Sequence, residues 1–348
     1  GWAGPIADRF SKRSISVLMK WFEIPIVIAA GIGFITGSFW LAAIAMFLLA
    51  TQSTFFSPAK YGMIPEIVPE DNISRANGLL NMTTNVSIIT GMLIAGIVSD
   101  QIQSEEQIAT MSFLPGVVLT SVAIIGLLAI VWLPKLCSMV PTIVLPLNPF
   151  GTYIKTSREM CKTQLMRVAI AWAFFYLLAT IVLLLVTELG KALQVSDTQI
   201  SYLLASIGIS VGLGSLLAGF LSKHKIQVKI SKFASIGMSV AVLVAGLAPL
   251  NYWIMLSALI VLGLSAGLYA VPLQSLMQAL PKPDHRGRVL ATSNAISFLL
   301  MATGSLGYWA IRPSFGSHPE YIFVVCAGIA LLAWAITLSI HVENDTIK

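Results

Sequence analysis

Amide side chains recur along one apolar stretch of this sequence at intervals of about one helical turn. Asn77, Asn81 and Asn85 lie four residues apart, so in an α-helix all three project from one face. An amide both donates and accepts hydrogen bonds, and it does so without placing a fixed charge in apolar surroundings. The stripe therefore predicts either a binding site for a polar ligand or hydrogen bonds that join neighbouring helices.

Other polar residues stand within or beside apolar runs, where an ionised group is costly. Lys20 and Glu23 are three residues apart and can neutralise each other on one helix face, either as a structural pair or as part of a cavity lining. Lys60 follows an apolar run just after Pro58, where its ammonium could contact a phosphate or act as an interfacial anchor. The candidate ligand-binding residues are Asn77, Asn81, Asn85, Asn294, Gln52, Gln274, Lys60 and Glu23.

No pattern typical of catalysis accompanies these residues. The four histidines lie in loops or at the ends of predicted helices, and the three cysteines show no CxxC spacing. The phosphate-binding loop of ATP-driven pumps, G-x-x-x-x-G-K-[ST], does not occur. The sequence therefore predicts neither an enzyme nor an ATP-driven pump, and it calls for no metal and no cofactor.

Long apolar helices must position the polar groups. Hydrophobic residues make up 57% of the 348 positions and charged residues only 10%, whereas a soluble domain carries roughly 25% charged residues. Apolar runs long enough to cross a hydrocarbon core about 30 Å thick recur along the whole chain. We expect ten membrane-spanning helices, near residues 14–36, 39–57, 73–99, 112–133, 166–189, 198–221, 231–249, 251–275, 289–311 and 320–341.

Positive charge alternates between the loops that connect these helices. Of the 21 lysines and arginines, all but Lys191 and Arg312 fall on one side of the predicted helices. Short loops rich in lysine and arginine stay in the cytoplasm. This side is therefore predicted to be cytoplasmic, and the side with Lys191 and Arg312 faces outward.

The two parts of the chain resemble each other at a nearly constant offset. A shift of 213 positions brings together Asp71 and Asp284, Arg75 and Arg288, Asn81 and Asn294, and Gly91 and Gly304, while Gly4 matches Gly219 at 215. Parallel repeats of six helices build some transporter folds. On this register the first two helices of twelve would precede residue 1, and we expect them to be missing here.

The first loop carries a motif that could lock and release helices. Residues 4–13 read GPIADRFSKR; Gly4 permits close helix approach, and Asp8 can face the positive end of a neighbouring helix. Arg9 and Arg13 could then form a cytoplasmic ion-pair latch, or they could be ordinary basic anchors. The motif resembles the signature G-x-x-x-D-R-x-x-x-R/K of the major facilitator superfamily, which implies a gating role for Asp8, Arg9 and Arg13.

Two further motifs resemble the bacterial lysophospholipid transporter family. They are SPAKYG at residues 57–62 and ANGL at 76–79. The resemblance covers essentially the whole chain and implies alternating-access transport of lysophospholipids, chiefly lysophosphatidylethanolamine, across the bacterial inner membrane. Relatives are fused to an acyltransferase and an acyl-carrier-protein ligase, so such an enzyme is an expected partner beside the membrane lipids. Nucleic acid is not an expected partner.

These observations predict an all-α polytopic membrane protein with a major facilitator fold. We expect an incomplete N-terminal helix bundle at 1–133, a cytoplasmic linker at 134–165 and a six-helix C-terminal bundle at 166–348. Two other functions stay open at this point. One is a permease for a water-soluble solute or drug, and the other is a non-transporting membrane anchor for a lipid acyltransferase.

Overall fold

The computed structural model describes residues 1–100, 111–137, 142, 147–222 and 225–340, and the regular structure in these ranges is helical. Ten of the described helices are long and apolar enough to cross a membrane, which confirms the ten predicted spans. They are α2 (Lys12–Ile35), α3 (Phe39–Ile67), α4 (Ile73–Asp100), α6 (Leu114–Val131), α8 (Leu165–Leu193), α9 (Asp197–Leu221), α10 (Val228–Leu247), α11 (Tyr252–Ala279), α12 (Arg286–Ile311) and α13 (Ile322–Leu338).

Helix α3 runs about ten residues beyond its predicted end at residue 57. It passes through Pro58 and Pro65 and ends at Ile67, so Lys60 lies on the helix and not in the loop after it. A proline removes one backbone donor, and neighbouring helices can satisfy the freed carbonyl in a membrane protein. Helix α11 likewise continues past Pro272. Both helices thus continue through internal prolines.

Short helices connect the long ones. Helix α1 (Ala3–Arg9) precedes α2, and α7 (Pro149–Cys161) lies within the predicted linker, of which residues 138–141 and 143–146 are outside the described ranges. Single 3₁₀ turns cover Glu70–Asn72, Arg312–Phe315 and Pro319–Tyr321. A tight turn joins α2 to α3 at Gly37, whose φ of +64° favours glycine.

The chain forms two compact units, and each is built from three separate segments of the sequence. The first unit comprises Gly1–Ile67, Thr90–Thr156 and Lys282–Ala291, and the second comprises Val68–Ile89, Ser157–Pro281 and Thr292–Lys348. Each repeat inferred from the sequence thus contributes a short segment to a unit built mainly by the other repeat. The division at 134–165 stays a prediction.

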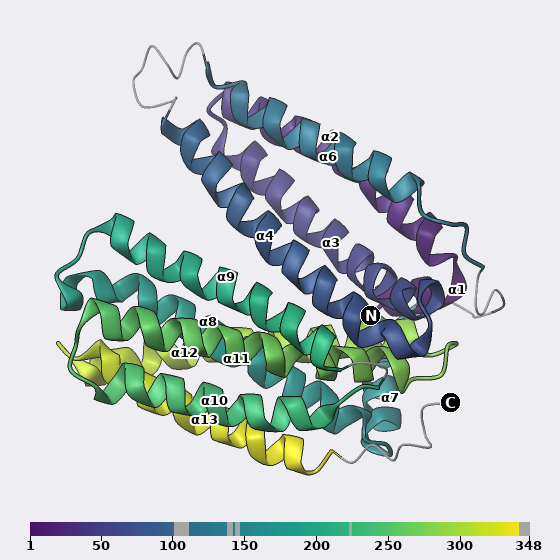
Figure 1. Cartoon of the computed structure of the whole chain (residues 1–348). Helices are drawn as coiled ribbons and strands as arrows, with labels where there is room; N and C mark the ends of the chain where they lie inside the picture. The colour runs from purple at the N-terminus through teal and green to yellow at the C-terminus, as the bar shows by residue number, and fades with distance from the viewer. Residues whose placement is uncertain (101–110, 138–141, 143–146, 223–224, 341–348) are drawn as a thin grey trace. The chain divides into compact units, whose positions relative to one another are not determined.

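Small residues bring the helices together inside each unit. In the first unit α2 packs against α3 and α6 (Figure 1), and a Cβ on Gly31 would lie 2.8 Å from the Cα of Gly116. In the second unit α11 packs against both α9 and α10, and a Cβ on Gly267 would lie 2.3 Å from the carbonyl oxygen of Val211. Close backbone approach at glycine is typical of helix packing in membranes.

Large apolar side chains cover much of the outer surface of these helices. Phe39, Trp40 and Phe47 on α3 are more than 70% exposed, as is Leu306 on α12. Such a surface is unfavourable in water and suits contact with lipid. Together with the ten apolar helices, it identifies the chain as a multi-pass membrane protein.

Candidate functional site

The first-loop motif folds as a short helix, a break and a long helix. Helix α1 ends at Arg9, its C-cap Phe10 is extended, and α2 begins at Lys12 with Ser11 as its N-cap. The Ser11 hydroxyl accepts a hydrogen bond from the backbone of Ser14. This break turns α1 so that Asp8, at its end, is completely buried.

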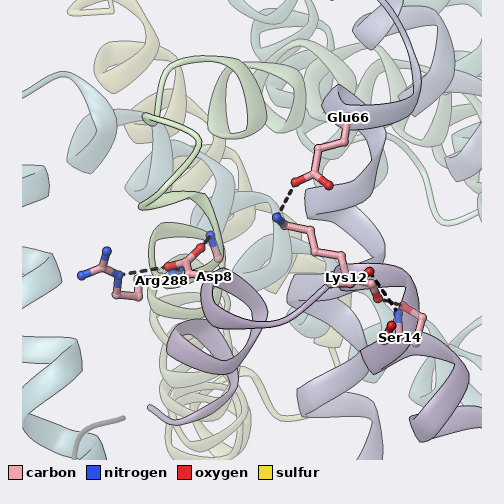
Figure 2. Close-up of polar contacts among 8 residues, drawn as sticks. Asp8, Lys12, Ser14, Glu66 and Arg288 are labelled. Carbon is pink, nitrogen blue, oxygen red and sulfur yellow. Dashed lines mark hydrogen bonds and ion pairs between the residues drawn. The ribbon is translucent and has the colours of Figure 1, made fainter. Parts of the chain in front are cut away.

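Asp8 lies at the N-terminus of α12, as the motif predicted. One carboxylate oxygen accepts a hydrogen bond from the backbone N–H of Gly287 at 2.7 Å. The other accepts from the backbone of Arg288 at 3.2 Å and from its Nε at 3.0 Å (Figure 2). Burial raises the pKa of Asp8 above its ordinary value, while these hydrogen bonds and the Arg288 charge act in the opposite direction. The carboxylate therefore joins the unpaired N–H groups of a helix start to a guanidinium.

Gly4 allows this contact to form. A Cβ on Gly4 would lie 2.7 Å from the Cα of Arg288 and 2.9 Å from the carbonyl oxygen of Gly287. Real side chains do not fit at such distances, so α1 can approach α12 this closely because residue 4 is glycine. We call the contact between α1 and the start of α12 the charged seam.

The other basic residues of the motif differ in part from the expected ion-pair latch. Lys12 is buried and forms an ion pair with Glu66 near the end of α3 (Figure 2). Arg13 donates to the backbone carbonyls of Leu133 (2.8 Å) and Val131 (2.7 Å), which end α6. Arg9 lies over the ring of Phe10. The motif's ion pairs are thus made by Asp8 and Lys12, and the gating roles of Arg9 and Arg13 stay predictions.

Sequence reasoning did not assign roles to Lys12, Glu66 and Arg288. Arg288 was visible only as the repeat partner of Arg75, and Glu66 was visible only as a carboxylate in the predicted loop between the spans 39–57 and 73–99. The pairing of residues 54 positions apart depends on tertiary packing that no local pattern contains.

The asparagine stripe of α4 meets glutamines on α11 inside the second unit. Asn77 and Gln278 exchange two hydrogen bonds, at 2.8 and 3.0 Å, and Asn77 also donates to Ser275. One turn along, Asn81 donates to Gln274 at 2.9 Å. The predicted hydrogen bonds between helices are therefore present, with Asn77 fully buried and Asn81 half-buried. A ligand-binding role for the stripe stays a prediction.

Two further asparagines of the candidate set also lie in the second unit. Asn85 donates to the backbone carbonyl of Asn81 on its own helix. Asn294, the repeat partner of Asn81, is half-buried on α12, and its neighbour Ser293 is completely buried. Asn81 and Asn294 both belong to the second unit.

Glycines close the contact between α4 and α9. A Cβ on Gly78 would lie 2.6 Å from the carbonyl oxygen of Ser215, and a Cβ on Gly219 would lie 3.2 Å from the Cα of Arg75. Ser74 and Ser215 keep buried hydroxyl groups that meet no hydrogen-bond partner among the described residues. We call this contact, together with the amides between α4 and α11, the amide seam.

Charged residues also lie within the first unit, well inside helix α2. Lys20 and Glu23 stand roughly 12 and 16 Å along the helix from its start at Lys12. Lys20 Nζ lies 2.8 Å from Glu23 Oε2, and both side chains are partly exposed, at 21% and 16%. Gln52 of α3 donates to the Met19 carbonyl at 3.0 Å and to Glu23 at 3.4 Å. The sequence-predicted pair is therefore present, and Gln52 joins it.

A purely structural role explains this pair poorly. Charged residues near a helix centre cost about 2.5–3.5 kcal/mol on insertion scales, whereas an ion pair within one helix returns about 0.2–0.5 kcal/mol. Because Lys20 and Glu23 stand on the same helix, their bond does not join two helices. The remaining candidate, Lys60, lies over the ring of Tyr61 on α3.

Comparison with known proteins places the chain in a family. The sequence profile of the Major Facilitator Superfamily matches residues 2–305 and 168–346. The lysophospholipid transporter LplT of Klebsiella pneumoniae is 25% identical over 347 residues, which cover 96% of this chain and 81% of that protein. Macrolide efflux protein A of Streptococcus pyogenes is 22% identical over 273 residues, which cover 76% of this chain but only 64% of that protein's length.

Solved structures show the same architecture. The crystal structure of the Major Facilitator Superfamily transporter FucP in the outward conformation superimposes with a TM-score of 0.76 at 10% identity, covering 96% of this chain and 85% of FucP. Because the family profile and the fold both extend over most of the residues, the chain belongs to the Major Facilitator Superfamily.

Proposed function

We propose that this protein moves lysophospholipids of the lysophosphatidylethanolamine type across the bacterial inner membrane by alternating access. The observation that supports this substrate class most strongly is the similarity to LplT along 96% of the chain. Membrane-embedded polar groups also fit a substrate whose phosphodiester and glycerol hydroxyl need hydrogen-bond partners in an otherwise apolar path.

The two seams give this transport a structural basis. The charged seam joins a segment of the first repeat to the start of α12, and the amide seam joins α4 of the first repeat to α9 and α11 of the second. Both lie at helix ends next to the predicted cytoplasmic loops. An inward-open state therefore requires both seams to separate, and their re-formation closes that side again.

Asn81 and Asn294 are the proposed contacts for the headgroup, together with Asn85 and Gln274 of the same unit. Asn77 can join them only when its bonds to α11 are broken. Gln52, Lys60 and Glu23 belong to the other unit and are proposed as a separate set of substrate contacts. Removing one amide contact should cost about 1–3 kcal/mol, which corresponds to a roughly ten- to hundredfold loss of apparent affinity. Asn81→Ala and Asn294→Ala should impair lysolipid transport without reducing the amount of folded protein. Normal transport per folded molecule, with lowered thermal stability, would assign both asparagines to helix packing.

The direct test is uptake of labelled lysophosphatidylethanolamine into spheroplasts that contain the complete protein. Uptake above that of cells without the protein is expected, and the absence of such uptake would overturn the proposal. A lipid acyltransferase that consumes the imported lysolipid is the proposed partner, and retention of label as diacyl phospholipid would report its action.

The similarity to macrolide efflux protein A favours a second candidate. A carboxylate within the membrane, such as Glu23, could receive the amine of a cationic drug. Outward movement of a labelled macrolide from loaded cells, without lysolipid uptake, would support drug efflux instead.

A further inference from the structure

We propose that the Lys20–Glu23 pair recognises a zwitterionic lysolipid headgroup by exchanging partners with it. In this exchange the phosphodiester takes the Lys20 ammonium, and the headgroup ammonium takes the Glu23 carboxylate. The inference rests on the proposed function, because it assigns residues to a substrate of that class. It adds that these two side chains determine which headgroups are preferred.

The geometry of the pair suits such an exchange. Lys20 Nζ contacts both carboxylate oxygens of Glu23, at 3.0 Å to Oε1 and 2.8 Å to Oε2. The two side chains are only partly buried, with 21% and 16% of their surfaces exposed. The ion pair joins two residues of α2, and the Gln52 amide links Glu23 to α3. The pair can therefore open while the bonds of Gln52 to Glu23 and Met19 remain.

The surroundings hold each charge in place. The Lys20 ammonium lies 5.6 Å from the centre of the Phe56 ring, a favourable position for a cation. A Cβ on Gly126 of α6 would lie 3.2 Å from Lys20 Nζ, so any larger residue there would crowd the ammonium. The Gln52 amide donates to Glu23 and is itself fixed by the Met19 carbonyl.

Partner exchange keeps the charges paired throughout binding. Before binding, Lys20 and Glu23 neutralise each other. After binding, the phosphodiester faces the Lys20 ammonium and the headgroup ammonium faces Glu23. An anionic headgroup without an amine would take Lys20 and leave Glu23 with the Gln52 amide alone, which is less favourable in a membrane. The site should therefore favour zwitterionic over anionic lysolipids.

Another membrane carboxylate could in principle bind the ammonium, and the structure provides it as a matched control. Glu188 on α8 is held by Arg312, whose Nε lies 2.6 Å from Glu188 Oε2. Its partner is an arginine from a different helix, so this pair joins helices whereas the Lys20–Glu23 pair does not.

The test measures uptake of lysophosphatidylethanolamine and lysophosphatidylglycerol by the complete protein in spheroplasts, and reports the ratio of the two rates. Glu23→Gln keeps the size and the hydrogen bond to Gln52 but removes the charge. This variant should lower the ratio by about tenfold or more, because the ethanolamine ammonium loses its partner while the glycerol headgroup does not. Glu23→Asp should retain most of the ratio, and Glu188→Gln should leave it unchanged.

The outcomes separate this inference from the proposed function. If the unmodified protein transports neither lipid, the proposed function itself fails. If it transports both and Glu23→Gln slows them equally, Glu23 acts in folding or gating and the partner-exchange site is wrong. A change of the ratio in Glu188→Gln but not in Glu23→Gln would also overturn it. Size-exclusion profiles and amounts of purified protein show whether each variant is folded.

Discussion

The starts of α4 and α12 occupy related positions in the sequence repeat, yet they are held in different ways. At α12 a buried carboxylate, Asp8, binds two backbone N–H groups and the Arg288 guanidinium. At α4, Gly78 packs against the backbone of Ser215, and Gly219 of α9 packs against the backbone of Arg75. The Asn77–Gln278 amide pair lies beside these glycine contacts. Gly4 and Gly219 match each other in the repeat, but the offset of 215 that relates them places Lys223 opposite Asp8.

This difference follows from the chemistry of the two contacts. A buried carboxylate depends on its partners, because an unpaired charge in a low-dielectric site is costly. Glycine contacts and amide pairs depend mainly on shape and contribute less each. Arg75, the repeat partner of Arg288, lies instead over the ring of Phe220 at 5.7 Å. We therefore expect the charged seam to tolerate single substitutions less well than the amide seam.

The largest effect is expected from Asp8→Asn. Asparagine would keep one acceptor, but its NH₂ group would face a donor of Gly287 or Arg288, and the Arg288 charge would lose its partner. Loss of one member of a buried pair costs about 3–5 kcal/mol. Ala291 is buried in this seam, so a cysteine introduced by Ala291→Cys reports its opening. This cysteine should react much faster with a maleimide in the Asp8→Asn background than in protein that retains Asp8. Equal labelling rates in both backgrounds would show that Asp8 does not hold the seam.

A methyl group should test the two glycines directly. A Cβ at Gly4 would lie 2.7 Å from backbone, whereas one at Gly219 would come no closer than 3.2 Å. Gly4→Ala should therefore destabilise the protein by about 1–3 kcal/mol, the range for overpacking, and Gly219→Ala should have a clearly smaller effect. Thermal unfolding in detergent measures both. A larger loss of stability in Gly219→Ala would reverse the comparison.

A double-mutant cycle isolates the amide pair. Asn77→Ala, Gln278→Ala and their combination should give a coupling energy of about 1 kcal/mol, in the range found for hydrogen bonds between membrane helices. Asn85→Ala is the matched control, because its amide bonds only to a carbonyl of its own helix. Combined with Gln278→Ala, this control should show no coupling. Coupling near zero for Asn77 and Gln278 would remove the pair from the seam.

The smallest effect is expected from Arg13→Gln. Arg13 donates to the last carbonyls of α6, and a basic residue at a helix C-terminus contributes about 0.3–1 kcal/mol. Labelling of Ala291→Cys should therefore hardly change. An increase as large as that caused by Asp8→Asn would restore Arg13 to the latch that the sequence motif suggested.

The sequence predicted those features that depend on local composition or on a short motif. Apolar run length located the ten spans, and the motif at residues 4–13 placed Asp8 at a helix N-terminus. The sequence did not show that Lys12 pairs with Glu66 or that Gln278 faces Asn77, because each of these pairs joins residues of different helices that are distant in the sequence. The asparagine stripe indicated a polar face without its neighbour. The end of α3 was predicted about ten residues too early, at residue 57, although the membrane helix continues through Pro58 and Pro65.

If both seams open in every transport cycle, a disulfide across the amide seam should stop transport. Asn77 Nδ2 lies 3.1 Å from the Ser275 hydroxyl, so Asn77→Cys with Ser275→Cys should form a disulfide once the three native cysteines are replaced. We predict that oxidation lowers lysophosphatidylethanolamine uptake to background and that a reductant restores it. Unchanged uptake in fully cross-linked protein would contradict the account.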